Sequence, residues 1–233
     1  MLIGIFETDL LDKPLLKTFG SYGQMFEKLL LNADKNLQFR YYQVLTGELP
    51  ASPGECDAWL ITGSKASVTE SQQWINKLSL FIKKIHKAEA RLVGICFGHQ
   101  LIAKTLDGCV IKSDKGWGVG VHCTRVLKHR QWMAPSTKQF NLIVSHQDQV
   151  VKLPPNAENI FSTDFCEFSG FQIKNHILTF QGHPEFSVKY ALNRIESRRH
   201  LLSSQRYNTA IESYKNPADA PLVGKWLVEF LKH

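Results

Sequence analysis

The feature that most constrains the fold lies at residues 91–106, where an apolar run meets a cysteine flanked by glycines. Residues 91–95 (RLVGI) have the composition of a buried strand, and residues 100–106 have the pattern of a helix. Between them stands Gly-Ile-Cys-Phe-Gly, with Cys96 at its centre. A strand that turns sharply into a helix through Gly-x-nucleophile-x-Gly lifts the central side chain clear of the sheet edge. The segment therefore predicts an α/β sheet that presents Cys96 at the end of a strand.

The chemistry expected of Cys96 follows from that turn. Glycines two residues to either side are needed, because a Cβ there would collide with neighbouring backbone. Sulfur at a helix N-terminus is favoured as thiolate by the helix dipole and by free N–H groups. The backbone amide of Phe97 would point to where an oxyanion forms. Cys96 is thus a candidate nucleophile; the alternative is that it is a small buried hydrophobe, as most cysteines are.

The rest of the chain predicts a largely parallel sheet with covering helices. Strand patterns occupy residues 2–6, 37–44 and 58–61, and helical spacing occupies 23–31, 71–87, 188–197, 201–214 and 222–231. From Cys109 to about Phe180 the pattern is strand with turn residues, which predicts an antiparallel excursion from the sheet. We expect one domain spanning residues 1–233, a flavodoxin-like three-layer α/β sandwich.

Composition narrows the class of function. The 233 residues are 43% hydrophobic and 21% charged, as in ordinary globular domains. No apolar stretch approaches the roughly 20 residues of a membrane helix, and no signal peptide is expected. The five cysteines include no Cys-x-x-Cys pair, which argues against disulfides and a zinc site. We therefore expect a cytoplasmic protein without membrane contact, metal or other cofactor.

The formal charge of +7 raises the hypothesis of nucleic-acid binding. The lysines and arginines are dispersed, however, and the densest clusters, at 83–87 and 198–199, fall in predicted helices. Such clusters are usually solvated faces, so no nucleic-acid partner is expected. The excess charge would favour an anionic small substrate or an acidic partner.

A second motif supplies a base for the nucleophile. Residues 178–182 form an apolar run that ends in His183-Pro184-Glu185. A cysteine that attacks an amide needs a base that later protonates the leaving amine, and His183 can fill that role. Glu185 can accept a hydrogen bond from the other ring nitrogen and fix the tautomer. The alternative is that His183, like most isolated histidines, has a purely structural role.

The two motifs together resemble the class I (triad-type) glutamine amidotransferase family. Residues 94–100 (GICFGHQ) and 181–185 (QGHPE) match it in order and separation, and the resemblance covers nearly the whole chain. It is closest to stand-alone members similar to the glutaminase domain of GMP synthetase. The resemblance implies a triad of Cys96, His183 and Glu185, a small γ-glutamyl substrate and a γ-glutamyl thioester intermediate.

Three further segments match the family less completely. Gly63 stands where the family usually has Gly-Gly-Pro, and its amide would join that of Phe97 in an oxyanion hole. Residues 144–150 resemble the family's Ser-His-Gly-Asp segment, whose backbone holds the substrate's α-amino and α-carboxylate groups. The resemblance thus implies substrate contacts at Ser145, His146, Gln147 and, one turn beyond the cysteine, Gln100. Gln147 replaces the usual glycine, so the pocket is expected to differ in shape there.

Several functions remain open at this point. The chain could be a glutaminase subunit that works with a separate synthetase, or a self-sufficient γ-glutamyl peptide hydrolase. It could also be a catalytically silent regulatory protein, although the intact Cys-His-Glu set argues against that. Protease-like relatives of this architecture usually place a histidine directly after the cysteine, where this chain has Phe97. The glycines at 116–120 do not precede a helix and predict a turn into a strand, without nucleotide binding.

Overall fold

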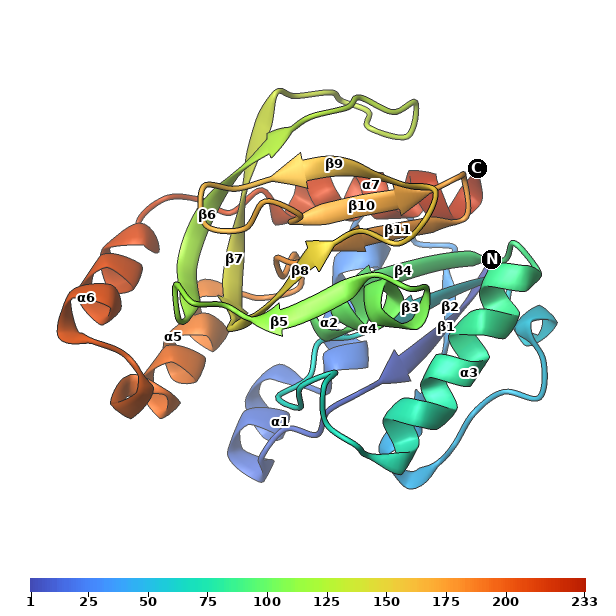
Figure 1. Cartoon of the computed structure of the whole chain (residues 1–233), viewed down its shortest axis with the longest axis horizontal. Helices are drawn as coiled ribbons and strands as arrows, with labels where there is room; N and C mark the ends of the chain where they lie inside the picture. The colour runs from blue at the N-terminus through green and yellow to red at the C-terminus, as the bar shows by residue number, and fades with distance from the viewer.

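The computed structural model describes all residues, Met1–His233, and confirms the α/β architecture (Figure 1). The strands are β1 (Leu2–Glu7), β2 (Gln38–Gln43), β3 (Ala58–Ile61), β4 (Arg91–Ile95), β5 (Cys109–Lys112), β6 (Gly118–Val126), β7 (Gln139–His146), β8 (Asp148–Lys152), β9 (Ala157–Ser162), β10 (Gly170–Ile173) and β11 (Ile177–Phe180). The helices are α1 (Lys13–Phe19), α2 (Tyr22–Leu31), α3 (Gln73–Lys87), α4 (Phe97–Thr105), α5 (Val188–Ser197), α6 (Ser204–Ser213) and α7 (Ala220–Lys232).

Nine strands form one sheet in the order β2-β1-β3-β4-β11-β10-β9-β6-β7. The first five run parallel, and every pairing from β11 to β7 is antiparallel. The antiparallel excursion expected between Cys109 and Phe180 is therefore present, and its strands extend the sheet. Strands β5 and β8 leave it to form a separate two-stranded ribbon. The chain returns through β11 to pair with β4, which brings two distant segments together.

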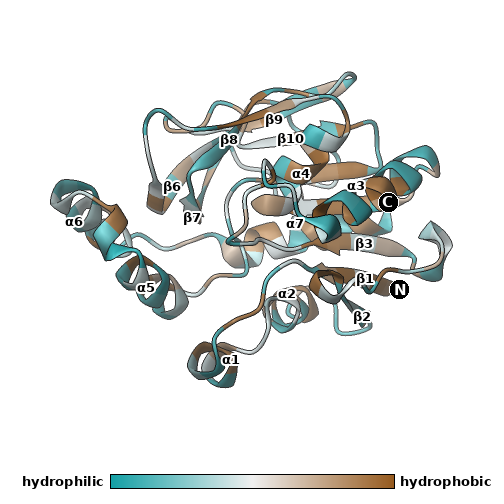
Figure 2. Cartoon of the chain, turned by 60° about the horizontal axis from the view of Figure 1, so that its bottom comes forward, coloured by the Kyte–Doolittle hydropathy of each residue, from teal (hydrophilic) through white to brown (hydrophobic).

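Helices cover both faces of the parallel half. Phe26 of α2 and Trp226 of α7 belong to one apolar cluster with the strand residues Ile5 and Val93. On the opposite face, α3 and α4 bury a second cluster against Trp59 and its neighbours. Figure 2 shows the outcome, with hydrophobic strands between helices whose outward sides are hydrophilic. The core thus lies in two layers, one on each side of the sheet.

The helices differ from the predicted ranges at two places. Helix α1 was not predicted, because it has only seven residues and none of them is fully buried, so its apolar pattern is short. The helix predicted over 201–214 is a 3₁₀ turn (Arg199–Leu201) followed by α6. The Ser203 hydroxyl accepts a hydrogen bond from the Arg206 amide and starts α6 there. No helix of the chain combines the length and hydrophobicity needed to span a membrane.

Candidate active site

The ends of three neighbouring strands bring the predicted site residues together. Gly63 follows β3, Cys96 follows β4, and His183 follows β11, and these strands are adjacent in the sheet. The Cys96 amide donates to the Phe180 carbonyl at 2.8 Å, so the pairing of β4 with β11 continues to the nucleophile. The carboxyl ends of parallel strands are where open α/β sheets bind their ligands. The sheet topology therefore gathers three segments that are distant in sequence.

The backbone at Cys96 has the strained geometry expected of a nucleophile elbow. Its φ of 51° and ψ of −99° lie in a region that residues other than glycine rarely adopt. A Cβ at Gly94 would lie 2.8 Å from the Gly98 carbonyl, and one at Gly98 would lie 2.6 Å from the Ile61 carbonyl. Such a conformation costs roughly 1–3 kcal/mol and persists only where surrounding packing imposes it. The strain holds the Cys96 side chain at the start of α4.

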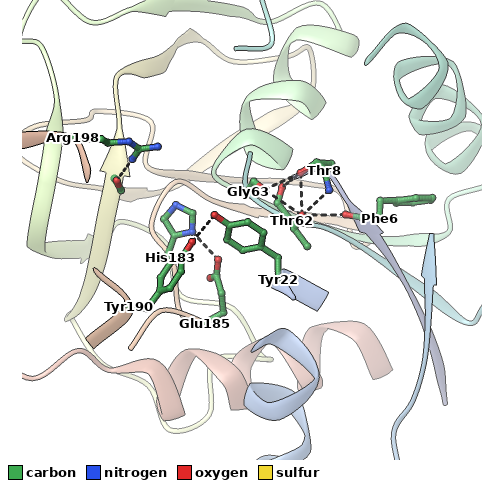
Figure 3. Close-up of polar contacts among 10 residues, drawn as sticks. Phe6, Thr8, Tyr22, Thr62, Gly63, His183, Glu185, Tyr190 and Arg198 are labelled. Carbon is green, nitrogen blue, oxygen red and sulfur yellow. Dashed lines mark hydrogen bonds and ion pairs between the residues drawn. The ribbon is translucent and has the colours of Figure 1, made fainter. Parts of the chain in front are cut away.

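His183 and Glu185 form a buried pair (Figure 3), and His183 lies beside this cysteine. His183 Nδ1 lies 2.7 Å from Glu185 Oε1, and the His183 ring stacks on Phe186 at 3.9 Å between centroids. Burial alone would lower the pKa of His183, but the Glu185 carboxylate and Cys96 outweigh it and raise that pKa to about 10. The Glu185 carboxylate therefore favours the protonated, imidazolium form of His183. Cys96 is one of the groups that raise this pKa, so the two side chains lie close together.

The other two histidines near Cys96 are neutral. Burial lowers the pKa of His99 and of His146 to about 3 each. His99 Nδ1 contacts the Thr179 hydroxyl at 2.8 Å, and His146 Nδ1 donates to the Asp148 carbonyl at 3.1 Å. Neither ring has a carboxylate partner in the structure. Of the three histidines, His183 alone has the charge and the orienting carboxylate that acid–base catalysis requires.

Gly63 lies against both the cysteine and the histidine. A Cβ on Gly63 would be 2.7 Å from His183 Cε1 and 3.6 Å from the Cys96 Cβ. The Thr8 hydroxyl donates to the Gly63 carbonyl at 2.9 Å and fixes the peptide (Figure 3). The amides of Gly63 and Phe97 donate to no acceptor within the protein. Two N–H groups beside the sulfur are thus free to bind an oxyanion.

The expected substrate contacts line one cavity with the cysteine. A hollow of about 330 Å³ is bordered by Cys96, Gln100, Ser145, His146 and Gln147, among others. Gln100 Nε2 donates to the Asp148 carbonyl at 2.8 Å and to Gln181 Oε1 at 3.1 Å, so its carbonyl oxygen is the atom left for a substrate. A larger hollow of about 570 Å³, around Arg91 and Trp132, contains none of these residues.

Comparison with known proteins places this geometry in a family. The model of the glutamine amidotransferase class-I family matches residues 17–199. The chain belongs to this family. Among solved structures, a glutamine amidotransferase from Thermotoga maritima superposes with a TM-score of 0.75, at 20% identity, over 99% of this chain and 96% of that one. This likeness supports the glutamine amidotransferase fold derived above.

Curated relatives of this glutamine amidotransferase domain include two that match it over most of its length. A glutamine amidotransferase-like protein of Schizosaccharomyces pombe is 32% identical over 237 residues, which cover 94% of this chain and 95% of that one. Gamma-glutamyl peptidase 4 of Arabidopsis thaliana is 29% identical over 226 residues, 93% of this chain and 89% of that one. A glutamine-hydrolyzing GMP synthase component of Archaeoglobus fulgidus is 29% identical over 123 residues, 50% of this chain and 65% of that one.

Sequence reasoning missed several residues of this candidate site. Arg198 was expected on a solvated helix face, but it lines the cavity that holds Cys96. Tyr22 and Tyr190 share a hydroxyl–hydroxyl hydrogen bond of 2.7 Å near Glu185 (Figure 3). Thr8 lies beyond the end of β1 and had no motif to mark it. Only the rule that parallel strand ends converge could have drawn attention to Thr8.

Proposed function

We propose that residues 1–233 form a single domain that hydrolyses a γ-glutamyl amide through a γ-glutamyl thioester on Cys96. The observation that carries this proposal is the strained elbow cysteine beside a histidine whose ring Glu185 holds at 2.7 Å. Membership of the glutamine amidotransferase class-I family supports it. In this proposal Cys96 is the nucleophile, His183 the acid and base, and Glu185 the residue that orients His183.

In the first half-reaction, the Cys96 thiolate attacks the γ-carbonyl carbon of the substrate. The amides of Gly63 and Phe97 bind the oxyanion that forms, since neither amide has another acceptor. Glu185 occupies His183 Nδ1, which leaves Nε2 to give its proton to the leaving nitrogen. The C–N bond then breaks, the amine or ammonia departs, and the glutamyl group remains as a thioester.

In the second half-reaction, water attacks the thioester carbonyl. His183, now neutral, takes one proton from that water and returns to the imidazolium form. The C–S bond breaks, the sulfur leaves as thiolate, and glutamate is released. Gln100, Ser145, His146 and Gln147 would hold the glutamyl group throughout, because they border the cavity next to Cys96.

Two substrate classes follow from the relatives. Gamma-glutamyl peptidase 4 and its Arabidopsis counterparts support a self-sufficient hydrolase that acts on γ-glutamyl peptides. The GMP synthase relative supports a second candidate, in which the chain hydrolyses glutamine for a separate synthetase. The Arabidopsis match extends over 93% of this chain, against 50% for the GMP synthase relative, so we favour the first candidate.

A panel of γ-glutamyl compounds tests the proposal on the purified protein, with glutamate and ammonia both quantified. Self-sufficient hydrolysis predicts glutamate from γ-glutamyl dipeptides without any added protein. The alternative, a glutaminase that serves a synthetase, predicts that glutamine yields glutamate and ammonia. Adding lysate that contains the partner synthetase should then increase the rate of glutamine hydrolysis. Cys96→Ala is the matched control and should release neither product. Absence of glutamate from every compound, with and without lysate, would overturn both candidates and favour a silent regulatory protein.

A further inference from the structure

Arg198 directs a positive charge into the cavity of the cysteine. It caps the C-terminal end of α5, where the side chain is half-buried. Its guanidinium lies 4.6 Å from the centre of the Trp117 ring and donates a hydrogen bond to the Ser145 hydroxyl. All three residues border the cavity that contains Cys96. Stacking on tryptophan fixes the plane of the guanidinium, as in sites where arginine recognises a planar anion.

No carboxylate in the protein neutralises this guanidinium. Arg198 belongs to none of the ion pairs in the structure, whereas Lys65, on the same cavity, pairs with Asp9 at 3.3 Å. Burial lowers the pKa of Arg198, and the neighbouring Arg194 lowers it further. The side chain remains charged, because arginine is not deprotonated in proteins. A half-buried charge of this kind is stabilised when a bound anion supplies the missing partner.

The position of Arg198 relative to His183 indicates which part of a substrate it meets. A small extension of the site is lined by Gly63, Ser145, His183, Phe186 and Arg198, among others. Arg198 lies across His183 from Gly63 (Figure 3). The oxyanion forms at Gly63, and the leaving nitrogen must lie where His183 can protonate it. The extension that Arg198 lines is not bordered by Gln100, His146 or Gln147, so the group attached to that nitrogen is the part of the substrate that can reach it.

We propose that Arg198, held by Trp117 and Ser145, binds a carboxylate on the leaving group of the substrate. This inference rests on the proposed function and names its substrate class, which is γ-glutamyl amino acids or peptides with a free carboxylate near the scissile amide. Glutamine has ammonia as its leaving group and offers no such carboxylate. The same residue would thus favour peptide hydrolysis over glutamine hydrolysis.

Substrates that differ only in the leaving group test whether Arg198 binds a carboxylate on that group or contributes to catalysis on every substrate. We compare kcat/KM for γ-glutamylglycine, γ-glutamylglycinamide and glutamine, which share the glutamyl group and differ in the leaving group. The wild-type protein should prefer γ-glutamylglycine to its amide by about 10- to 100-fold, as expected for one charge-assisted hydrogen-bonded pair. Arg198→Gln should lose most of that preference, chiefly through γ-glutamylglycine. Arg198→Lys should retain part of it, since the charge remains without the planar fork.

Arg199→Gln is the control, because Arg199 stacks on Tyr207 at 4.4 Å and does not border the cavity. It should keep the wild-type preference. Equal wild-type rates on γ-glutamylglycine and its amide would overturn the inference without any variant, while leaving γ-glutamyl hydrolysis in place. An equal loss on all three substrates in Arg198→Gln would also overturn it, since Arg198 would then act on the glutamyl group or the fold. No turnover of any substrate by the wild type would instead overturn the proposed function, and this inference with it.

Discussion

Replacing Gly98 by alanine tests how closely the elbow is fitted to the sheet. The added Cβ would lie 2.6 Å from the Ile61 carbonyl oxygen and 2.9 Å from the Ile61 Cβ. Helix α4 and strand β3 must therefore separate by about 0.8 Å to reach the 3.4 Å of ordinary van der Waals contact. Overpacking of this kind costs about 1–3 kcal/mol of unfolding free energy. For a chain of this size, that corresponds to a fall in Tm of roughly 2–12 °C.

The same displacement acts on catalysis, because Ile61 is two residues before Gly63. Moving β3 away from α4 shifts the Gly63 amide relative to Cys96, and a misplacement near 1 Å lowers rates by about 100-fold. Thermal unfolding and kcat on a γ-glutamyl substrate measure the two effects. Gly54→Ala is the control, since an added Cβ there meets only the Ser52 hydroxyl, at 3.8 Å. A Gly98→Ala protein with wild-type Tm and kcat would refute the close packing of the elbow.

The further predictions concern the proposed triad. Cys96→Ser should keep its Tm within about 2 °C of wild type, yet lower kcat by several orders of magnitude, because a serine hydroxyl at neutral pH is a far poorer nucleophile; retained turnover would remove Cys96 from the mechanism. His183→Ala should reduce kcat more than Glu185→Ala does, since orientation can be lost in part while the base cannot; equal losses would give Glu185 more than an orienting role. The pKa of His183, raised to about 10 in the folded protein from an ordinary 6.5, predicts that kcat/KM falls as pH rises through about 10, where the imidazolium is lost. The ion pair between His183 and Glu185 should stabilise the fold fully below about pH 6.5 and lose that effect as the pH rises toward 10. The free energy of unfolding, measured in urea as a function of pH, reports this change. Glu185→Gln should shift the alkaline fall in kcat/KM to lower pH, and an unchanged profile would contradict the charge-based cause.

The elbow could be predicted from sequence because its determinants are local. Gly94 and Gly98 are needed by contacts within the turn and with the neighbouring strand, and both stand within two residues of Cys96. The proximity of Cys96 and His183 could not be predicted from local sequence alone, since the two residues are 87 positions apart. The His-Pro-Glu motif and the family resemblance paired them, and the rule that parallel strand ends share one edge explains why they meet.

Arg198 could not be predicted in the same way. Its environment depends on Trp117, which precedes β6, and on Ser145 in β7, and no local pattern connects these residues. In sequence, a basic pair at the end of a helix is typical of a solvated face. Helix α1 was missed because it has only seven residues, of which Leu15 and Phe19 are partly buried, too few to give a clear apolar period.

The most direct test of the central claim is covalent capture at Cys96. The protein is incubated with diazo-oxonorleucine, a glutamine-analogue electrophile, and the labelled residue is identified by intact mass and peptide mapping. We predict one adduct per chain, on Cys96, with protection by a γ-glutamyl substrate and no labelling of Cys96→Ala. The exposed Cys109 and Cys123 serve as internal controls and should stay unmodified. Labelling that falls on those cysteines, or that persists in Cys96→Ala, would contradict the assignment of the nucleophile.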